Sequence, residues 1–229
     1  MKIIDVLLKV AGKENFKIDS EVSNKYIFYL AKNYGIMMIR GKLLSLGNKD
    51  ISHKIFVGKK VKFIEKKKVK VGSNTKIHSG TKIDALSKDG VLIGNNVVIG
   101  KDSIIECTGS IRQVGKGLKI GNNTSFGNEC FFGAAGGIEI GNDVIGGQLI
   151  RFHSENHNFK SHDKLIREQG VVHKGIKVGN NCWIGSGVVF LDGSGIGDGC
   201  VVAANSVVTK QFGNNIIIGG TPARVLKER

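Results

Sequence analysis

The sequence predicts an all-β fold, a parallel β-helix, from three observations. First, residues 178–210 fall into blocks of six that each open with an apolar residue: Val178, Ile184, Phe190, Ile196, Val202 and Val208. Neither a helix nor a simple alternating strand repeats every six residues, whereas a hexapeptide β-helix does. Second, an apolar-Gly-Asn-Asn/Asp corner recurs in VLIGNNVVIGKD, LKIGNNTSFGNE, IEIGNDVIG and IKVGNNCWIGSG. Third, glycine supplies 33 of 229 residues and proline only one, which suits repeated tight corners.

Each block of six predicts one short strand and one turn, and three blocks make one coil. The opening residue points into a narrow interior and stacks on its equivalent in the next coil. Glycine and asparagine at the corners allow positive φ at little steric cost. Upstream triplets begin at Val71, Ile93 and Ile120, and the phase breaks between them predict short insertions at the corners.

Residues 1–52 lack the sixfold period and predict a short N-terminal helical cap on the open end of the stack. Apolar residues follow helical spacing in two groups: Ile3, Ile4, Leu7 and Leu8, then Tyr26, Ile27, Leu30 and Tyr34. We expect two short helices joined by Gly12 to Ser20, the second ending near Gly35 or Gly41. An alternative interpretation is a membrane-surface patch from Tyr26 to Leu46 with nearby basic residues: Lys25, Lys32, Arg40 and Lys42.

The formal net charge of +15 favours anionic partners, although a solvated basic surface explains it equally well. Residues 54–70 hold eight lysines against Glu65 alone, alternating with apolar residues in a way that predicts an irregular first coil. The lysines are either a charged rim that protects an edge strand or a docking site for acidic glycan or membrane. Nucleic acid is not expected, because no nucleic-acid-binding motif accompanies the charge.

The cysteines Cys107, Cys130, Cys182 and Cys200 have no metal-binding spacing, and the last two should stack as buried residues one coil apart. A reduced, cytoplasmic chain is expected, either free or peripheral at the inner face of the membrane. The segment MKIIDVLLKV is too short and too charged for a signal peptide, and no apolar run approaches the ~20 residues that span a bilayer.

The largest interruption of the repeats, residues 146–177, carries four of the six histidines: His153, His157, His162 and His173. A polar loop on a rigid scaffold is a common place for chemistry. We therefore divide the chain into a cap (residues 1–52), a β-helix (53–220) with a projecting loop (146–177), and a C-terminal tail (221–229).

The repeats, the histidine-containing loop, VGNNCWIGSGVVF, VVAANSVVTK and GGTPARVL resemble the left-handed β-helix hexapeptide acyltransferases over roughly residues 71–226. The sequence is most similar to the sugar O-acetyltransferase branch, which includes galactoside, maltose, capsule and lipopolysaccharide O-acetyltransferases. Left-handedness is implied by the resemblance alone, since parallel crossovers are generally right-handed. The resemblance also implies a homotrimer that binds acetyl-CoA between neighbouring stacks, uses no metal and acetylates a hydroxyl group directly.

Carried onto this sequence, the resemblance implies His157 as the general base, with His153 as the alternative base, and Trp183 as a wall of the acetyl site. It implies contacts to the pantetheine arm or phosphates of CoA from four residues: Ser186, Ala204, Thr209 and Lys210. Arg224 would lie near the nucleotide. Asn128 falls near the family's acceptor-binding asparagine, although FGNEC departs from the usual pattern there.

A sugar hydroxyl needs a base to attack a thioester near neutral pH, and histidine, with an ordinary pKa of ~6.5, is suited to that task. Glu155 is either a residue that orients the His157 imidazole or a solvated loop acid. We therefore expect an acetyl-CoA-dependent O-acetyltransferase acting on a surface polysaccharide or its precursor.

Three alternatives remain open at this point. One is an N-acetyltransferase of nucleotide sugars. Another is a zinc protein similar to trimeric carbonic anhydrases, with His153, His157 and His162 as ligands. The third is a basic scaffold that binds acidic glycan through residues 54–70 and catalyses nothing.

Overall fold

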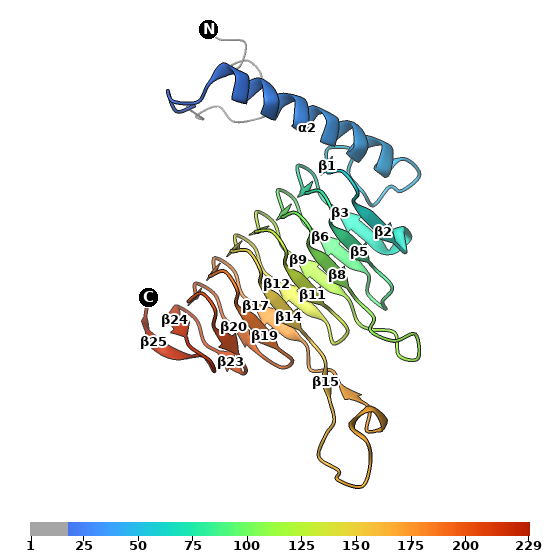
Figure 1. Ribbon diagram of the computed structural model, residues 1–229, viewed down its shortest axis with the longest axis vertical. Helices are drawn as coiled ribbons and strands as arrows, with labels where there is room; N and C mark the ends of the chain where they lie inside the picture. Colours follow the sequence, from blue (N-terminus) through green and yellow to red (C-terminus); the bar gives the residue numbers. More distant parts are fainter. Residues whose placement is uncertain (1–17) are drawn as a thin grey trace. The chain divides into compact units, whose positions relative to one another are not determined.

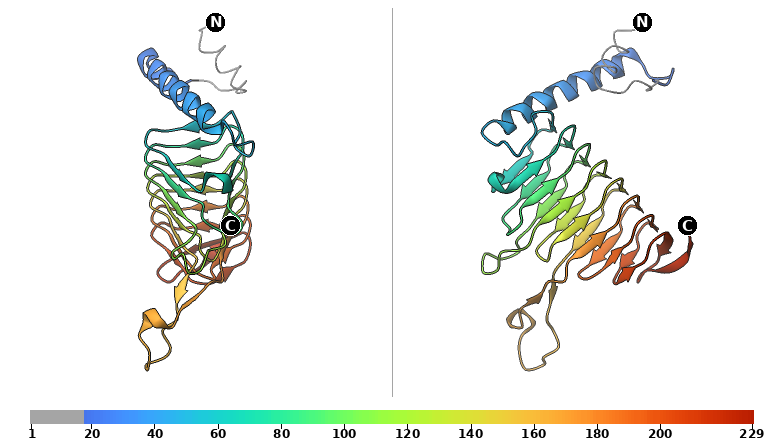
Figure 2. Two further views of the ribbon diagram at one scale, coloured as in Figure 1. Left: turned by 90° about the vertical axis from the view of Figure 1, so that its right-hand side faces the viewer. Right: turned by 180° about the vertical axis from the view of Figure 1, so that it is seen from behind.

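The computed structural model describes residues 18–229, and the chain divides into one unit of residues 1–36 and a second of residues 37–229. The helix expected around Ile3 to Leu8 lies outside the described residues. The second unit contains all of the repeats, and its coils stack into a three-sided prism (Figures 1 and 2).

Each side of the prism is one sheet of short strands, all parallel except the last strand of sheet B. Sheet A contains β3 (Val69–Val71), β6 (Val91–Ile93), β9 (Leu118–Ile120), β12 (Ile138–Ile140), β17 (Ile176–Val178), β20 (Gly195–Ile196) and β23 (Gln211–Phe212). Sheet B contains β1 (Phe56–Val57), β4 (Lys76–Ile77), β7 (Val98–Ile99), β10 (Ser125–Phe126), β13 (Ile145–Gly146), β18 (Trp183–Ile184), β21 (Val201–Val202), β24 (Ile216–Gly219) and β25 (Arg224–Glu228). Sheet C contains β2 (Lys62–Ile64), β5 (Lys82–Asp84), β8 (Ile104–Glu106), β11 (Phe131–Gly133), β14 (Arg151–His153), β19 (Val189–Leu191) and β22 (Val207–Val208). The predicted parallel β-helix is confirmed.

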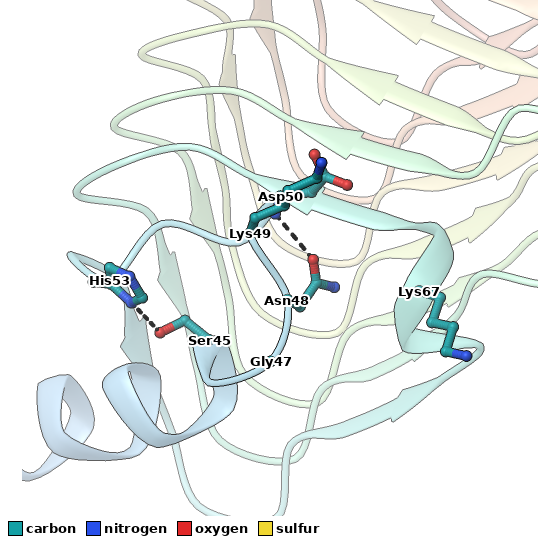
Figure 3. Close-up of a pocket in the computed structure, with 7 residues that line it drawn as sticks. All are labelled: Ser45, Gly47, Asn48, Lys49, Asp50, His53 and Lys67. Carbon is teal, nitrogen blue, oxygen red and sulfur yellow. Dashed lines mark hydrogen bonds between the residues drawn. The ribbon is translucent and has the colours of Figure 1, made fainter.

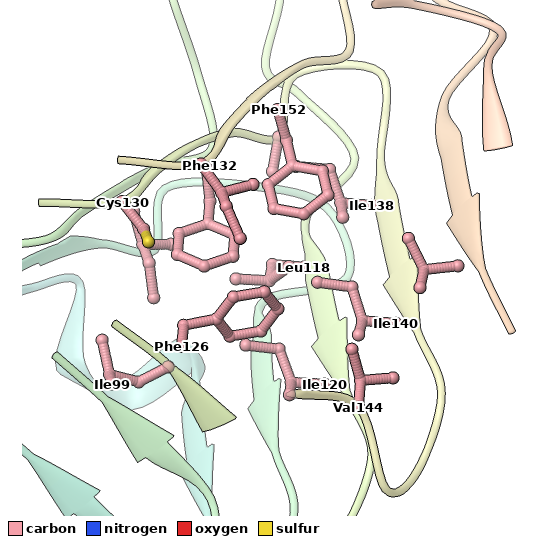
Figure 4. Packing of buried hydrophobic residues seen from close by; sticks show 14 of the residues in the cluster. Ile99, Leu118, Ile120, Phe126, Cys130, Phe132, Ile138, Ile140, Val144 and Phe152 are labelled. Carbon is pink, nitrogen blue, oxygen red and sulfur yellow. The ribbon is translucent and has the colours of Figure 1, made fainter. Parts of the chain in front are cut away.

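The inward residues of successive strands form continuous columns, as the block-opening residues predict. Sheet C stacks Phe132, Phe152 and Phe190, whose ring centroids lie 5.2 and 5.0 Å apart. Phe126 meets the Phe132 ring edge to face at 5.1 Å (Figure 4). Each ring removes a large apolar surface from water, so these columns supply most of the hydrophobic stabilisation of the prism.

The corner between sheets A and B explains why Gly-Asn-Asn recurs. The first asparagine of each corner accepts a hydrogen bond from a backbone N–H of the preceding coil; Asn95, Asn122 and Asn142 do so at 2.7–2.8 Å. The second residue has positive φ, as at Asn96 (57°) and Asn123 (56°). The glycine serves a different purpose, because a Cβ at Gly121 would lie 2.6 Å from the backbone of Gly141.

All four cysteines are buried, which was predicted for Cys182 and Cys200, and these two hold corners together. Cys182 Sγ donates to the carbonyl oxygen of Gly197 at 3.2 Å, and Cys200 Sγ donates to that of Gly213 at 3.0 Å. Thr124 makes the equivalent bond through its hydroxyl, to Gly141 at 2.9 Å. Burial raises the pKa of the Cys182 thiol to about 11.

The N-terminal elements differ from the sequence prediction. One helix, α2 (Asn24–Ser45), runs through Gly35 and Gly41, so the predicted ends at these glycines are wrong. Within the second unit, Gly41 lets the helix pack closely on the first coil, since a Cβ there would lie 2.0 Å from the carbonyl oxygen of Ile55. The first coil is irregular, as expected, with the 3-10 helix η1 (Lys66–Lys68) at one corner.

Two boundaries also change. Residues 146–153 and 176–177, expected in the projecting loop, belong to the prism, the first group in the coil of β13 and β14, where Phe152 fills an inward position, and the second in β17. Residues 224–228, expected as a tail, form β25 and pair antiparallel with β24. No helix within residues 18–229 is long and apolar enough to cross a membrane.

Phe152→Ala should lower the free energy of unfolding by about 3–5 kcal/mol, because it leaves a cavity between two stacked rings. Urea denaturation measures this change. Phe159→Ala is the matched control, since that ring is 67% exposed and its loss should cost less than about 1 kcal/mol. Equal stability of the two variants would contradict the stacking role of Phe152.

Candidate functional site

His157 lies on a projecting loop that leaves the prism between sheets C and A, over residues 154–175 (Figure 2). Its strand, β15 (Asn156–His157), pairs antiparallel with β16 (Val171–Val172), and His157 lies opposite Val171. The imidazole is exposed. Further along the loop, after η2 (Ile166–Glu168), the Gln169 amide closes the tip by donating to the carbonyl oxygens of Ser161 and Lys164, both at 2.9 Å. The loop is therefore ordered by its own hydrogen bonds.

A polar pair joins the two stems of the loop. Nε2 of His173 lies 2.6 Å from Oε2 of Glu155, and their side chains are 18% and 32% exposed. The carboxylate of Glu155 thus contacts His173, whereas the sequence suggested His157 as its partner. The pair fixes the base of the hairpin rather than the His157 imidazole.

Asp192 anchors the returning stem to the next coil. Its Oδ1 accepts hydrogen bonds from the backbone N–H groups of Lys174 and Gly175, both at 2.8 Å. The side chain is 7% exposed, and among the described residues neither its Oδ2 nor the hydroxyl of Ser194 has a hydrogen-bond partner. A buried carboxylate is costly to desolvate, so these two bonds must offset much of that cost.

His153 does not belong to the loop. It lies on the outer face of β14, in register between Gly133 and Leu191, and its ring centroid is 5.3 Å from that of Phe131. Partial burial, reinforced by the positive charge of Arg151, lowers the pKa of His153. His162 is exposed on the loop. Within residues 18–229 of one chain, no three His, Cys, Asp or Glu side chains are grouped to hold a metal ion.

Trp183 lies on a different side of the prism, on the outer face of sheet B. Its side chain is 58% exposed and stands in register between Ile145, which is 61% exposed, and Val201. The sequence did not single out Ile145, whose exposure follows from its place directly before an inward residue. Together these side chains form an outward apolar strip.

Three predicted residues share the corner between sheets B and C. Asn128, Ser186 and Ala204 are all exposed there, on three different coils. The corners pack tightly, since a Cβ at Gly185 would lie 2.5 Å from the backbone nitrogen of Ala204. Asn128 uses its Oδ1 to accept from the backbone of Lys101 at 2.9 Å, which leaves its amide nitrogen as the available donor.

The remaining predicted residues lie elsewhere. Thr209 and Lys210 are exposed at the corner between sheets C and A, on the side where the loop leaves. The Lys210 ammonium lies 5.4 Å from the ring centroid of Phe212. Arg224 is exposed on β25, opposite Gly219. One chain therefore distributes the predicted residues over two corners, the outer faces of sheets B and C, and one loop, with sheet C separating His157 from Trp183.

Each of these positions offers a different chemical group. His157 presents an imidazole that a substrate can reach. Trp183 and the corner with Ser186 and Ala204 form a shallow, largely uncharged surface. Arg224 supplies a cation on β25 of sheet B, and Lys210 supplies one at the corner between sheets C and A. An imidazole is suited to proton transfer, and cations with backbone N–H groups are suited to phosphates.

Comparisons with known proteins agree with the fold described above. Residues 175–210 match the family model described as bacterial transferase hexapeptide (six repeats). AntD, an N-acyltransferase from Bacillus cereus solved in complex with dTDP and 3-hydroxybutyryl-CoA, superposes with a TM-score of 0.53 at 16% identity, covering 83% of this chain and 88% of AntD. The protein therefore has the fold predicted for it, the left-handed parallel β-helix of hexapeptide-repeat proteins.

Sequence relatives narrow the resemblance. Galactoside O-acetyltransferase of Escherichia coli strain K12 is 44% identical over 64 residues, which are 28% of this chain and 32% of that enzyme. The putative lipopolysaccharide biosynthesis O-acetyl transferase WbbJ of the same strain is 31% identical over 98 residues, 40% of this chain and 50% of WbbJ. The resemblance to sugar O-acetyltransferases is thus confirmed, and the chain spans half or less of the length of these curated relatives.

Asp192→Ala should loosen the returning stem of the loop, because the N–H groups of Lys174 and Gly175 lose their acceptor. Hydrogen exchange at these two amides should become at least about tenfold faster. Asp192→Asn keeps a side-chain oxygen and should exchange at nearly the parent rate. Unchanged protection in Asp192→Ala would show that Asp192 does not anchor the loop.

Proposed function

We propose that the protein is an acetyl-CoA-dependent O-acetyltransferase that modifies a sugar hydroxyl of a surface polysaccharide, such as capsule or lipopolysaccharide, or of its precursor. The observation that carries the proposal is the exposed His157 on an ordered, anchored loop. The family match over residues 175–210 and the acetyltransferase relatives support the reaction class.

In this reaction the sugar hydroxyl oxygen attacks the thioester carbonyl carbon while the His157 imidazole accepts the hydroxyl proton. The C–S bond of the tetrahedral intermediate then breaks, and the imidazolium returns the proton to the departing CoA sulfur. Backbone N–H groups at a glycine-rich corner are suited to the oxyanion. A base of this kind contributes ~10²–10⁴ in rate.

For the donor, we propose that the pantetheine arm lies along the outer corner that carries Ser186 and Ala204, beside Trp183. Lys210, Thr209 and Arg224 are proposed to contact the phosphates and the nucleotide end. AntD is described with 3-hydroxybutyryl-CoA, which supports CoA binding on this fold. Asn128 is proposed to contact the acceptor through its amide nitrogen.

Because one chain keeps His157 apart from Trp183, we propose that the site forms between copies of a homotrimer. The outward apolar strip supports this, since Ile145 and Trp183 are more than half exposed in one chain. The outer face of sheet A, by contrast, carries charged residues such as Lys119, Glu139 and Lys177. The charged outer face of sheet A is therefore expected to be exposed to solvent. The apolar outer face of sheet B is expected to contact a neighbouring copy.

A second candidate is N-acetylation of a nucleotide sugar, which AntD favours because it is an N-acyltransferase described with dTDP. Both reactions need the same proton acceptor and the same donor. They differ in the acceptor atom, so parallel assays with amino sugars and hydroxyl sugars distinguish them.

We propose that the protein acts in the cytoplasm, where the proposed donor, acetyl-CoA, is made.

His157→Ala should lower kcat at least ~10²-fold and leave CoA binding nearly unchanged, because the imidazole acts only on the reacting hydroxyl. A thiol-release assay with acetyl-CoA and a panel of acidic and neutral glycans measures turnover, and calorimetry measures CoA binding. His162→Ala is the control, because that exposed imidazole lies on the same loop. Full activity of His157→Ala would end the assignment of the base.

A further inference from the structure

The last turns of α2 expose apolar side chains to solvent on the side that faces away from the prism. Met38, Ile39 and Leu43 are 48%, 60% and 62% exposed, and Leu46, directly after the helix, is 59% exposed. The opposite side of the same turns is buried, through Met37, Gly41 and Ser45. We call the four exposed residues the helix surface.

Helical spacing explains how both sides are apolar. Met37, Gly41 and Ser45 follow one another at four-residue intervals and are buried; Gly41 packs against Ile55 and Ser45 forms a hydrogen bond with His53. Ile39 and Leu43 share the same interval but are offset by two residues, so they project away from the buried side. One apolar side of this helix packs on the protein core. The other side is exposed, and an exposed apolar surface of this kind suggests that it packs against a partner or a membrane.

Basic residues border the helix surface. Lys42 and Lys49 are exposed beside it, and Arg40 is partly exposed. The basic helix η1 lies close to its end, since Asn48 Nδ2 donates to the carbonyl oxygen of Lys66 at 3.1 Å. Two acids lie along this border: Asp50, which is 3.8 Å from the Lys70 ammonium, and Glu65, which directly precedes η1. The border is therefore predominantly positive.

An open hollow of about 630 Å³ follows directly after Leu46. It is lined by Ser45, Gly47, Asn48, Lys49, Asp50, His53 and Lys67 (Figure 3). His53 is held there by the Ser45 hydroxyl, which lies 2.7 Å from its Nδ1. Because the Ser45 hydroxyl donates to the carbonyl oxygen of Lys42 at 2.8 Å, it accepts from His53, which leaves the ammonium groups of Lys49 and Lys67 as the donors that the hollow offers to an anionic group. The one acid in the lining, Asp50, lies 3.8 Å from the Lys70 ammonium.

We propose that the helix surface and its basic border dock on an anionic phospholipid bilayer. The apolar side chains enter the boundary between headgroups and acyl chains, and the hollow receives a headgroup phosphate. Charge complementarity favours this occupant over a second copy of the chain, which would place the same positive borders against each other. Interfacial binding of this kind needs no transmembrane segment. Docking adds a partner to the proposed transferase and uses none of its site residues.

Co-flotation of the full chain with vesicles tests the proposal. We expect binding to vesicles of phosphatidylcholine with about 30% phosphatidylglycerol, weak binding to phosphatidylcholine alone, and release by high salt. Ile39→Glu/Leu43→Glu should weaken binding at least about tenfold. Ile104→Glu/Ile111→Glu is the matched control, because it adds the same two charges at side chains that are 39% and 86% exposed away from the helix surface.

Charge is tested separately. Lys42→Gln/Lys49→Gln/Lys67→Gln should weaken binding to anionic vesicles at least about tenfold. Lys88→Gln/Lys119→Gln/Lys227→Gln removes the same charge from exposed positions elsewhere and should weaken it much less. Both outcomes together would support a local basic border rather than net charge.

The proposal is overturned if the full chain binds neither vesicle, or if Ile39→Glu/Leu43→Glu binds like the parent. It is also overturned if that variant changes the oligomeric mass without any vesicle binding, since a second copy would then cover the helix surface. Acetyl transfer to a soluble acceptor, measured on the same variants, should match the parent. That readout distinguishes failure of docking from failure of the proposed transferase.

Discussion

The close spacing of successive coils governs the rest of this structure. Parallel strands hold each coil against the next, so every inward side chain must stack on an equivalent one and every corner must clear the backbone beside it. Asn122 accepts a backbone hydrogen bond of the preceding coil at 2.8 Å, and a Cβ at Gly121 would clash with Gly141. The repeat therefore persists because both the interior and the corners tolerate few alternatives.

The same constraint explains where chemistry resides. The interior is filled, so functional side chains are confined to outer faces, corners and the one long loop. Asp192 ties that loop to the rigid stack, and the Glu155–His173 pair joins its two stems, which together limit the positions His157 can take. Trp183 and Ser186 lie on the same coil, and the register of β18 with β13 fixes their positions on the prism. We therefore propose that a second copy brings its loop to the outer face of the first.

The repeat, the buried cysteines and the irregular first coil were predictable because each is a local pattern with a single packing solution. The coil at residues 145–153 was not, since Gly146 takes an inward place where the Phe126 ring fills the space, 2.4 Å from where a Cβ would lie. The pairing of Glu155 with His173 joins residues on opposite stems, and no spacing rule predicts it. The sequence hinted only weakly at the anchoring role of Asp192, as the one acid in the otherwise uncharged block of residues 190–195.

The central claim is that His157 of one copy serves the CoA-binding face of another. Co-assembly of His157→Ala chains with Trp183→Ala chains, each impaired alone, tests it directly. If the site lies between copies of a symmetric trimer, random mixing should restore about a quarter of the wild-type activity, because that fraction of sites takes an intact residue from each partner. If each chain carries its own complete site, the mixed assemblies will show no more activity than the two variants measured separately.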